Sequence, residues 1–297
     1  MDRSSSGRIP FPMRKTLRAF GLARLMHPCR GIVTWASQRG FMSYSIAKHV
    51  PWSWVLEPFT IYGRGWKCRW FPTESDALGH RLFFTGLRVW EKETSPVMLE
   101  EMRRARCAVD VGANCGIYTV LGCTVNPEVR VVAIEPVPKA CAALENNVRQ
   151  NGYDSRVTVL NIALGDFDGM VSFHEAEDST VSSLAVHRKG RRGKIIEIRC
   201  RTLDSVVEEL KIEPDFLKID VEGFEHLVLG GASQVLTKFR PCIILEVIHG
   251  EPAAAITGAL SRYGYRFQNI TDRGLETRSE IVPVKDCPNW RCSPNPH

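Results

Sequence analysis

The sequence of 297 residues lacks several features that would decide its class at once. It has no run of about 18 consecutive apolar residues, the length that a membrane-spanning helix needs. It has no repeat with a period of 20 to 50 residues and no low-complexity linker. Its ten cysteines include no CxxC pair, and Cys287 and Cys292 have the wrong spacing for a zinc knuckle. We therefore expect a cytoplasmic protein without membrane spans, with reduced cysteines.

Outside the N-terminus, basic and acidic side chains are nearly equal in number, so neither sign of charge is in excess. The formal net charge is +6, but residues 1–40 carry eight basic side chains and one acid, so the rest of the chain is close to neutral. A neutral body does not favour nucleic-acid binding, which needs a basic surface along the phosphates. The basic N-terminus suits a solvated arm, a weak contact with a membrane surface or an organelle-targeting peptide.

The pattern of apolar residues predicts four parts. Residues 1–45 form a basic, partly disordered arm, and residues 46–105 a small β/α extension rich in tryptophan. From 106 to 285, short apolar runs alternate with helical stretches, which is typical of a parallel sheet with crossover helices. Within it we expect a helix over 225–237, hairpin strands at 170–173 and 195–199, and last strands at 265–269 and 281–284. Residues 286–297, which contain three prolines, are predicted to be a flexible tail.

The segment Asp110–Gly116 joins a predicted strand to a helix through small residues. Such a turn lets the backbone approach a ligand closely. The glycine spacing is GxxxG rather than the GxGxxG that cradles a pyrophosphate, and Asp110 stands two residues before the first glycine. A carboxylate there suits a ligand with an ammonium and a sulfonium, as in S-adenosylmethionine. Asn114 can adopt the left-handed backbone conformation that this turn needs.

A second acid follows the next predicted strand. Glu135 comes 19 residues after Gly116, at the strand's carboxyl end. An acid about 20 residues beyond the glycine loop accepts hydrogen bonds from the ribose diol in nucleoside-binding folds. Glu135 therefore supports a nucleoside ligand without choosing between a nicotinamide cofactor and S-adenosylmethionine.

A third acidic motif spans Lys218–His226 and follows a later strand. Asp220 and Glu222 are expected at the carboxyl edge of the sheet, where ligands of open α/β sheets bind. Glu225 could equally favour the N-terminus of the next helix electrostatically. Lys218 is unusual inside a core strand, and an ion pair with a neighbouring acid would explain it.

These motifs, together with Ala163–Asp166 and Thr202–Asp204, resemble the FkbM family of methyltransferases over roughly residues 80–247. The resemblance implies an α/β, Rossmann-like class I methyltransferase fold. Its sheet would have seven strands, mostly parallel with the last one antiparallel, and helices on both faces. It also implies S-adenosylmethionine as cofactor and O-methylation of a hydroxyl on a sugar, glycan or natural product. The partner would then be a small-molecule or glycan acceptor.

The resemblance assigns roles to residues of this chain. The predicted cofactor-binding residues are Asp110, Gly112, Asn114, Gly116, Glu135, Asn161 and Ala163. Methyl transfer is an in-line displacement, and an aliphatic hydroxyl needs a base to accept its proton. The candidates for that base are Asp220, then Glu222 and His249, with His226 after them. No His-rich ligand set accompanies the acids, so we expect no metal.

Other functions stay open on the sequence alone. A non-catalytic cofactor-binding protein of the same fold would keep the glycine loop, and a methyltransferase acting on RNA or protein would keep every motif. The missing GxGxxG disfavours a nicotinamide-dependent oxidoreductase. The motifs identify neither the acceptor nor the oligomeric state.

Overall fold

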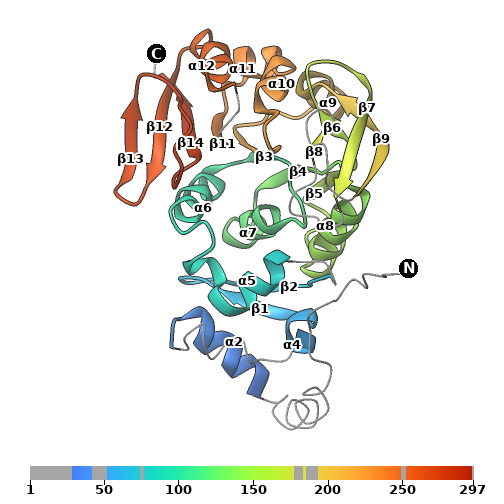
Figure 1. The fold of residues 1–297 in the computed structure, drawn as a ribbon, viewed down its shortest axis with the longest axis vertical. Coiled ribbons are helices and arrows are strands. Elements are labelled where there is room, and N and C mark those ends of the chain that lie inside the picture. The colour runs from blue at the N-terminus through green and yellow to red at the C-terminus, as the bar shows by residue number, and fades with distance from the viewer. Residues whose placement is uncertain are drawn as a thin grey trace, which may run out of the picture.

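A computed structural model describes residues 29–41, 52–73, 77–176, 183–184, 193–248 and 252–295. Figure 1 shows a central sheet with helices on both sides, and a smaller N-terminal part beside it. Within these ranges no helix is both long and apolar enough to cross a membrane.

The central sheet has eight strands in the order β13-β12-β14-β11-β10-β3-β4-β5. Neighbouring strands from β11 to β5 run parallel, as the alternating pattern predicted. These strands are β3 (Cys107–Val111), β4 (Arg130–Ile134), β5 (Val157–Leu160), β10 (Phe216–Ile219) and β11 (Cys242–Glu246). Strand order reverses between β3 and β10, so the crevice at their carboxyl ends is the expected place for a ligand.

Helices cover both faces of the sheet. On one face lie α6 (Thr94–Arg104), α7 (Ile117–Val125) and α8 (Pro138–Gln150). On the other lie α9 (Leu203–Leu210), α10 (Glu225–Gly230), α11 (Ser233–Lys238) and α12 (Ala253–Ser261). The strands between them are buried on both faces, which explains their nearly continuous apolar sequences. The Rossmann-like α/β fold is thereby confirmed.

The C-terminal edge of the sheet corrects two predictions. Residues 289–294, predicted to lie in a flexible tail over 286–297, form β14 (Asn289–Pro294) between β11 and β12 (Tyr265–Thr271). The predicted strand at 281–284 is absent from this described stretch, and β13 (Gly274–Arg278) pairs with β12 instead. Trp290 and Cys292 are fully buried, so the strand is fixed by its core contacts despite the nearby prolines. The sheet thus has one strand more than predicted.

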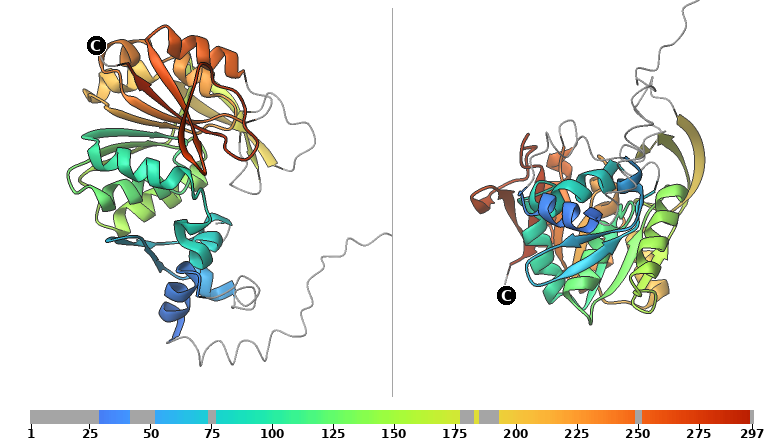
Figure 2. Two further views of the ribbon diagram at one scale, coloured as in Figure 1. Left: turned by 90° about the vertical axis from the view of Figure 1, so that its left-hand side faces the viewer. Right: turned by 90° about the horizontal axis from the view of Figure 1, so that it is seen from below.

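The N-terminal part packs against the sheet domain (Figure 2). It contains α2 (Arg30–Gln38), α4 (Trp52–Leu56), the hairpin β1 (Phe59–Tyr62) and β2 (Lys67–Trp70), α5 (Ala77–Thr85) and the 3-10 helix η2 (Gly86–Arg88). Within the predicted arm of residues 1–45, α2 is helical and bound to the hairpin, since Gln38 donates to the carbonyl of Thr60 and accepts from the amide of Tyr62. Residues 1–28 lie outside the described ranges. The division of the chain at residues 45 and 105 stays a prediction.

A second, smaller sheet stands beside the carboxyl edge. Its main strands, β7 (Gly169–Ala176) and β9 (Gly193–Arg201), are antiparallel, which confirms the predicted hairpin. The short strands β6 (Ala163–Leu164) and β8 (Ser183–Leu184) complete the order β6-β9-β7-β8. Figure 1 shows this sheet as an appendage at one side of the domain.

Candidate active site

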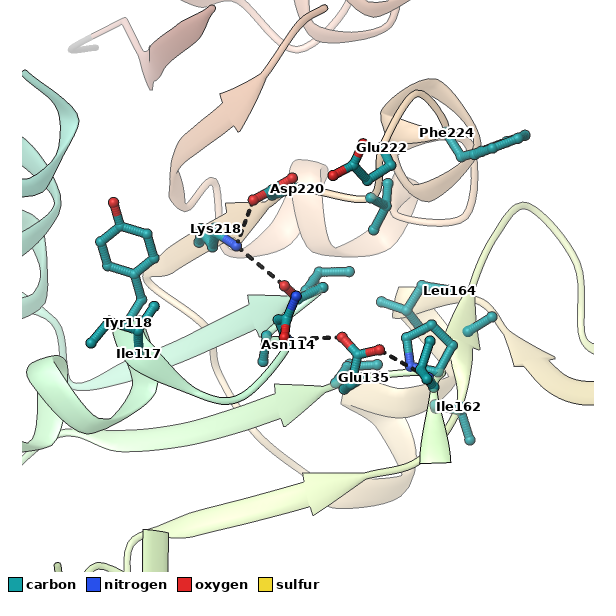
Figure 3. Close-up of a pocket in the computed structure, with 18 of the residues that line it drawn as sticks. Asn114, Ile117, Tyr118, Glu135, Ile162, Leu164, Lys218, Asp220, Glu222 and Phe224 are labelled. Carbon is teal, nitrogen blue, oxygen red and sulfur yellow. Dashed lines mark hydrogen bonds and ion pairs between the residues drawn. The ribbon is translucent and has the colours of Figure 1, made fainter. Parts of the chain in front are cut away.

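A cavity opens at the carboxyl ends of β3, β4 and β10, and Figure 3 shows the side chains that line it. Its wall combines apolar side chains with a group of acids. The polar and charged residues of the wall are Glu91, Asn114, Tyr118, Glu135, Lys218, Asp220 and Glu222. Its apolar side chains include those of Trp90, Ile117, Ile134, Ile162, Leu164, Phe173 and Phe224. The cavity lies where the strand order reverses, as expected for this class of sheet.

Two residues with a left-handed backbone conformation, Gly112 and Asn114, determine the shape of the loop after β3. Gly112 has φ +75°, and a Cβ atom there would come within 1.8 Å of the Asp220 carbonyl oxygen. Only glycine therefore lets β3 and β10 end so close together. Asn114 has φ 50°, and its side-chain oxygen accepts a hydrogen bond from the amide of Cys115. Both residues line the cavity. The close approach of this backbone to a ligand stays a prediction.

Glu135 ties the loop to the end of β4. Its carboxylate accepts hydrogen bonds from the amides of Asn114 (2.8 Å) and Val137 (2.9 Å). The residue is only 6% exposed, and burial raises the pKa of this carboxyl to about 7 despite these two bonds. Glu135 lines the cavity beside Pro136 and Ile162, the position predicted for a ribose acceptor.

Lys218 lies at the centre of the acids. Its ammonium donates to Asp220 Oδ2 (3.1 Å) and to the carbonyl of Gly112 (3.3 Å), and lies 3.7 Å from Asp110 Oδ1. Desolvation opposes its charge, but the neighbouring carboxylates more than compensate and raise the pKa of Lys218. The ion pair predicted for this buried lysine is confirmed. Figure 3 shows its bond to Asp220 at the cavity wall.

The side chain of Asp110 lies behind the loop and not in the cavity wall. Its side chain is fully buried behind the loop, where Oδ2 accepts a 2.7 Å hydrogen bond from Thr119 and Oδ1 faces Lys218. Asp110 is not among the residues that line the cavity, and its contact with the ammonium of a ligand stays a prediction. The sequence alone cannot show the contact with Lys218, since Lys218 is distant in the chain and only the pairing of β3 with β10 brings it to Asp110.

Two other predicted residues contribute indirectly. Gly116 begins α7 with φ +87°, and a Cβ atom there would come within 2.4 Å of Leu144 Cδ1. It therefore permits close packing of α7 against α8 rather than lining the cavity. The exposed Asn161 donates to the carbonyls of Glu135 and Pro136 and so holds the end of β4.

The remaining predicted residues divide between the cavity and its surroundings. Ala163, Asp220 and Glu222 line the cavity, and Glu222 has a left-handed backbone with φ 56°. Glu225 begins α10 and accepts from the amide of Val221 (2.8 Å), so it supports the loop that carries Glu222. His226 is outside the cavity wall, near Asp166, and burial lowers its pKa. His249 lies outside the described residues.

Three residues in or beside the cavity wall had no predicted role: Glu91, Tyr118 and Glu246. Glu91 precedes α6, and its carboxylate accepts a hydrogen bond from the hydroxyl of Tyr118 on α7. Glu246 ends β11, and the register of β10 with β11 places it beside Asp220. Burial and neighbouring acids raise the pKa of Glu91 to about 7 and that of Glu246 to about 9. An acid at the last position of a core strand was an available signal for Glu246.

The charges of the cavity suit a cationic ligand. Glu91, Glu135, Asp220 and Glu222 line it, and Lys218 is the only basic side chain among its described lining residues. A sulfonium and an ammonium would relieve the repulsion among these carboxylates. Among the residues that the structure describes, no group of three or more His, Cys, Asp or Glu side chains has an arrangement that could hold a metal ion.

Comparison with known proteins identifies relatives of this chain. The family model described as "Methyltransferase FkbM domain" matches residues 110–267, more than half of the chain. The hexuronic acid methyltransferase AglP of Haloferax volcanii is 30% identical over 173 residues, which are 58% of this chain and 68% of AglP. The 2-O-methyltransferase NoeI of Sinorhizobium fredii is 26% identical over 147 residues, 44% of this chain and 59% of NoeI.

A solved structure resembles the fold distantly. The FkbM methyltransferase of Methylobacillus flagellatus is 20% identical, with a TM-score of 0.43. The match covers 64% of this chain and 43% of that structure.

Proposed function

The chain belongs to the FkbM methyltransferase family, and from that premise we propose that it transfers a methyl group from S-adenosylmethionine to a hydroxyl of a sugar or glycan. The observation that carries the proposal is the acid-lined cavity at the carboxyl ends of β3, β4 and β10. The relatives support the acceptor class, since AglP is named for a hexuronic acid and NoeI for 2-O-methylation.

The residues of the cavity fit this cofactor. Glu135 would accept from the ribose hydroxyls, and the backbone from Gly112 to Asn114 would run beside the methionine part. Ile162 and Ala163 would border the adenine. Asp110 would act through Lys218, which it holds in place from behind the loop. S-adenosylmethionine, when bound, supplies a methyl group already activated by its sulfonium.

Asp220 is the base that we propose for the reaction. It ends β10 in the cavity wall, and its pairing with Lys218 fixes one carboxylate oxygen. Asp220 accepts the proton of the acceptor hydroxyl while the hydroxyl oxygen forms a bond to the methyl carbon. The bound cofactor would supply the methyl carbon and leave as a neutral thioether that keeps the electron pair of the carbon–sulfur bond. Glu222 is the second candidate, because it faces the same cavity.

Binding of S-adenosylhomocysteine tests the cofactor assignment. We expect micromolar binding by calorimetry, and a loss of at least about tenfold in Glu135→Ala, which removes two hydrogen-bond acceptors worth about 1.4 kcal/mol or more together. Glu145→Ala, an exposed acid on α8, is the matched control and should bind like the wild type. Equal binding by Glu135→Ala and the control would contradict the assignment.

Labelled methyl transfer tests the acceptor. The wild type is incubated with labelled S-adenosylmethionine and a panel of neutral sugars, uronic acids and glycans, and the products are analysed by mass. We expect label on a sugar hydroxyl, and no transfer above background by Asp220→Asn. Binding of the cofactor without transfer to any acceptor would instead favour a non-catalytic protein of this fold.

A further inference from the structure

Helix α2 packs on the N-terminal part through polar side chains. Thr34, Ser37 and Gln38 are buried, and Gln38 donates hydrogen bonds to the carbonyls of Thr60 and Leu82, both at 3.0 Å. A helix on the surface of a domain normally has the opposite arrangement, with apolar side chains inward and polar ones toward solvent. The buried bonds of Gln38 fix the orientation of α2, so its apolar side chains are held outward.

The outward side of α2 carries apolar side chains and one arginine. Ile32, Trp35 and Phe41 are 68%, 40% and 75% exposed. The chain turns back at Gly40 (φ +80°), and Phe41 then stacks on Trp35 with their ring centroids 5.8 Å apart. The guanidinium of Arg39 lies 5.2 Å from the centre of the Trp35 ring. We call Ile32, Trp35, Arg39 and Phe41 the outer face of α2.

Basic charge surrounds this outer face. Arg88 of η2 lies beside Gly40, since a Cβ atom on Gly40 would be 3.1 Å from Arg88 Cζ. Residues 1–88 contain 14 basic and 4 acidic side chains, whereas residues 89–297 contain 25 basic and 29 acidic ones. Figure 1 shows α2 at the end of the molecule opposite α10, α11 and α12. The exposed apolar side chains therefore belong to the basic part of a chain whose remainder is slightly acidic.

We propose that the outer face of α2 is a docking surface for a membrane that contains anionic lipids. Tryptophan and phenylalanine side chains insert among lipid headgroups, and basic side chains beside them are attracted to the anionic lipids. Docking would remove from water the apolar side chains that the fold leaves exposed. The inference goes beyond the proposed methyl transfer, because no residue of the outer face lines the cavity.

Two other partners fit the outer face less well. In a symmetric dimer of this chain through α2, the same surface meets itself, so Arg39 and Arg88 would approach the equivalent arginines of the partner. A nucleic-acid strand would use the basic charge, but it offers no partner for the aliphatic side chain of Ile32. A lipid surface satisfies both the charge and the apolar side chains.

Co-sedimentation of the full chain with unilamellar vesicles tests the apolar contacts. We expect binding to phosphatidylcholine vesicles with about 30% phosphatidylserine to be at least about tenfold stronger than binding to phosphatidylcholine alone. The double variant Trp35→Ala/Phe41→Ala should lose about tenfold or more, because two side chains no longer enter the interface. Leu275→Ala/Val282→Ala, which removes two other exposed apolar side chains, is the matched control and should bind like the wild type.

A second pair of variants tests the charge. Arg39→Gln/Arg88→Gln should bind the phosphatidylserine vesicles about tenfold less at about 0.1 M salt, and the difference should shrink at about 0.5 M salt because salt screens the attraction. Arg262→Gln/Arg273→Gln removes two exposed arginines elsewhere and should bind like the wild type. Circular dichroism of each variant establishes that it is folded.

Four results would overturn the proposal. The first is equal vesicle binding by the wild type and Trp35→Ala/Phe41→Ala, which would leave the basic charge alone responsible. The second is tighter binding to single-stranded polyuridylate than to the vesicles. The third is a dimer in sedimentation equilibrium that Trp35→Ala/Phe41→Ala abolishes, and the fourth is a wild type that binds neither kind of vesicle. A failure of methyl transfer would contradict only the proposed function, since the vesicle experiments measure no activity.

Discussion

At the scale of single residues, the site is organised by the excess of carboxylates around one lysine. Lys218 forms ion pairs with Asp110 and Asp220, whereas Glu91 accepts a hydrogen bond from the hydroxyl of Tyr118 and interacts with Lys218 more weakly. Burial is the largest influence on Glu91 and raises its pKa from 4.5 to about 7. A binding site that keeps a buried acid with a raised pKa gives up some stability of the folded chain in exchange for affinity toward a cation.

The stability of the unliganded protein should therefore depend on Glu91 and on pH. The folded state holds the Glu91 proton up to about pH 7, whereas the unfolded chain loses it near 4.5, so this group's contribution to stability falls as pH rises through that range. Glu91→Gln removes the titration. We expect its free energy of unfolding, relative to the wild type, to rise by about 2 kcal/mol between pH 5 and pH 8.

Urea denaturation at the two pH values measures this difference. Glu145→Gln, an exposed acid, serves as the control and should show no comparable change. A constant difference between Glu91→Gln and the wild type would mean that Glu91 titrates normally.

At the scale of elements, one acid explains why a predicted helix is divided in two. The sequence predicts a single helix over 225–237, but α10 ends at Gly230 and α11 begins at Ser233. Asp204 on α9 accepts hydrogen bonds from the Ser233 hydroxyl and from the amides of Gln234 and Val235. These are orphan donors of the first turn of α11, so Asp204 caps that helix from a different element.

Removing this carboxylate should destabilise the packing of α11. We expect Asp204→Ala to lower the free energy of unfolding by about 2 kcal/mol, the upper range for loss of a helix cap. Asp204→Asn keeps one acceptor oxygen and should lose less. Urea denaturation checks the order, with Asp154→Ala in an exposed turn as control. A loss in the control as large as in Asp204→Ala would show that the capping bonds are not the cause.

At the scale of the whole molecule, the N-terminal part and the sheet domain share one hydrophobic core. The fully buried Trp70 of β2 belongs to the same cluster as Leu121 of α7 and Ala133 of β4. Asn147 of α8, also fully buried, accepts from the amide of Phe71 and donates to the carbonyl of Cys115, next to the cofactor loop. The extension therefore supports the helices that carry the site.

A shared core predicts a shared unfolding transition. Trp70→Ala should cost about 3–5 kcal/mol, as expected for loss of a buried aromatic side chain, and should lower the midpoint of the whole chain. Near-UV and far-UV circular dichroism should report the same transition in both proteins. Two separate transitions in the variant, with the later one unchanged from the wild type, would show that the extension is an independent unit. Trp35→Ala on the exposed face of α2 is the control.

The sequence by itself determined the parallel core, the glycine loop and the acid at the end of β4. Apolar runs indicate which strands are buried. The glycine at 112 indicates a turn with a positive φ, which few other residues can adopt. Glu135 lies close to that turn in the chain. Local signals of this kind can be read without knowing which distant residues contact them in the folded chain. The same signals failed at β14, where prolines suggested a tail but a buried tryptophan and two partner strands hold it in the sheet.

Which charged side chains lie together in the site, and which of them are buried, follows from the tertiary structure alone. It buried Asp110 against Lys218 and Thr119, and it placed Glu246 beside Asp220 through the register of β10 and β11. The physical reason is that the electrostatic energy of a carboxylate depends on its distance to other charges and on the water it loses. Spacing in the sequence measures neither quantity, so Glu135, Asp220 and Glu222 were found from the chain alone, whereas Glu91 and Glu246 were not.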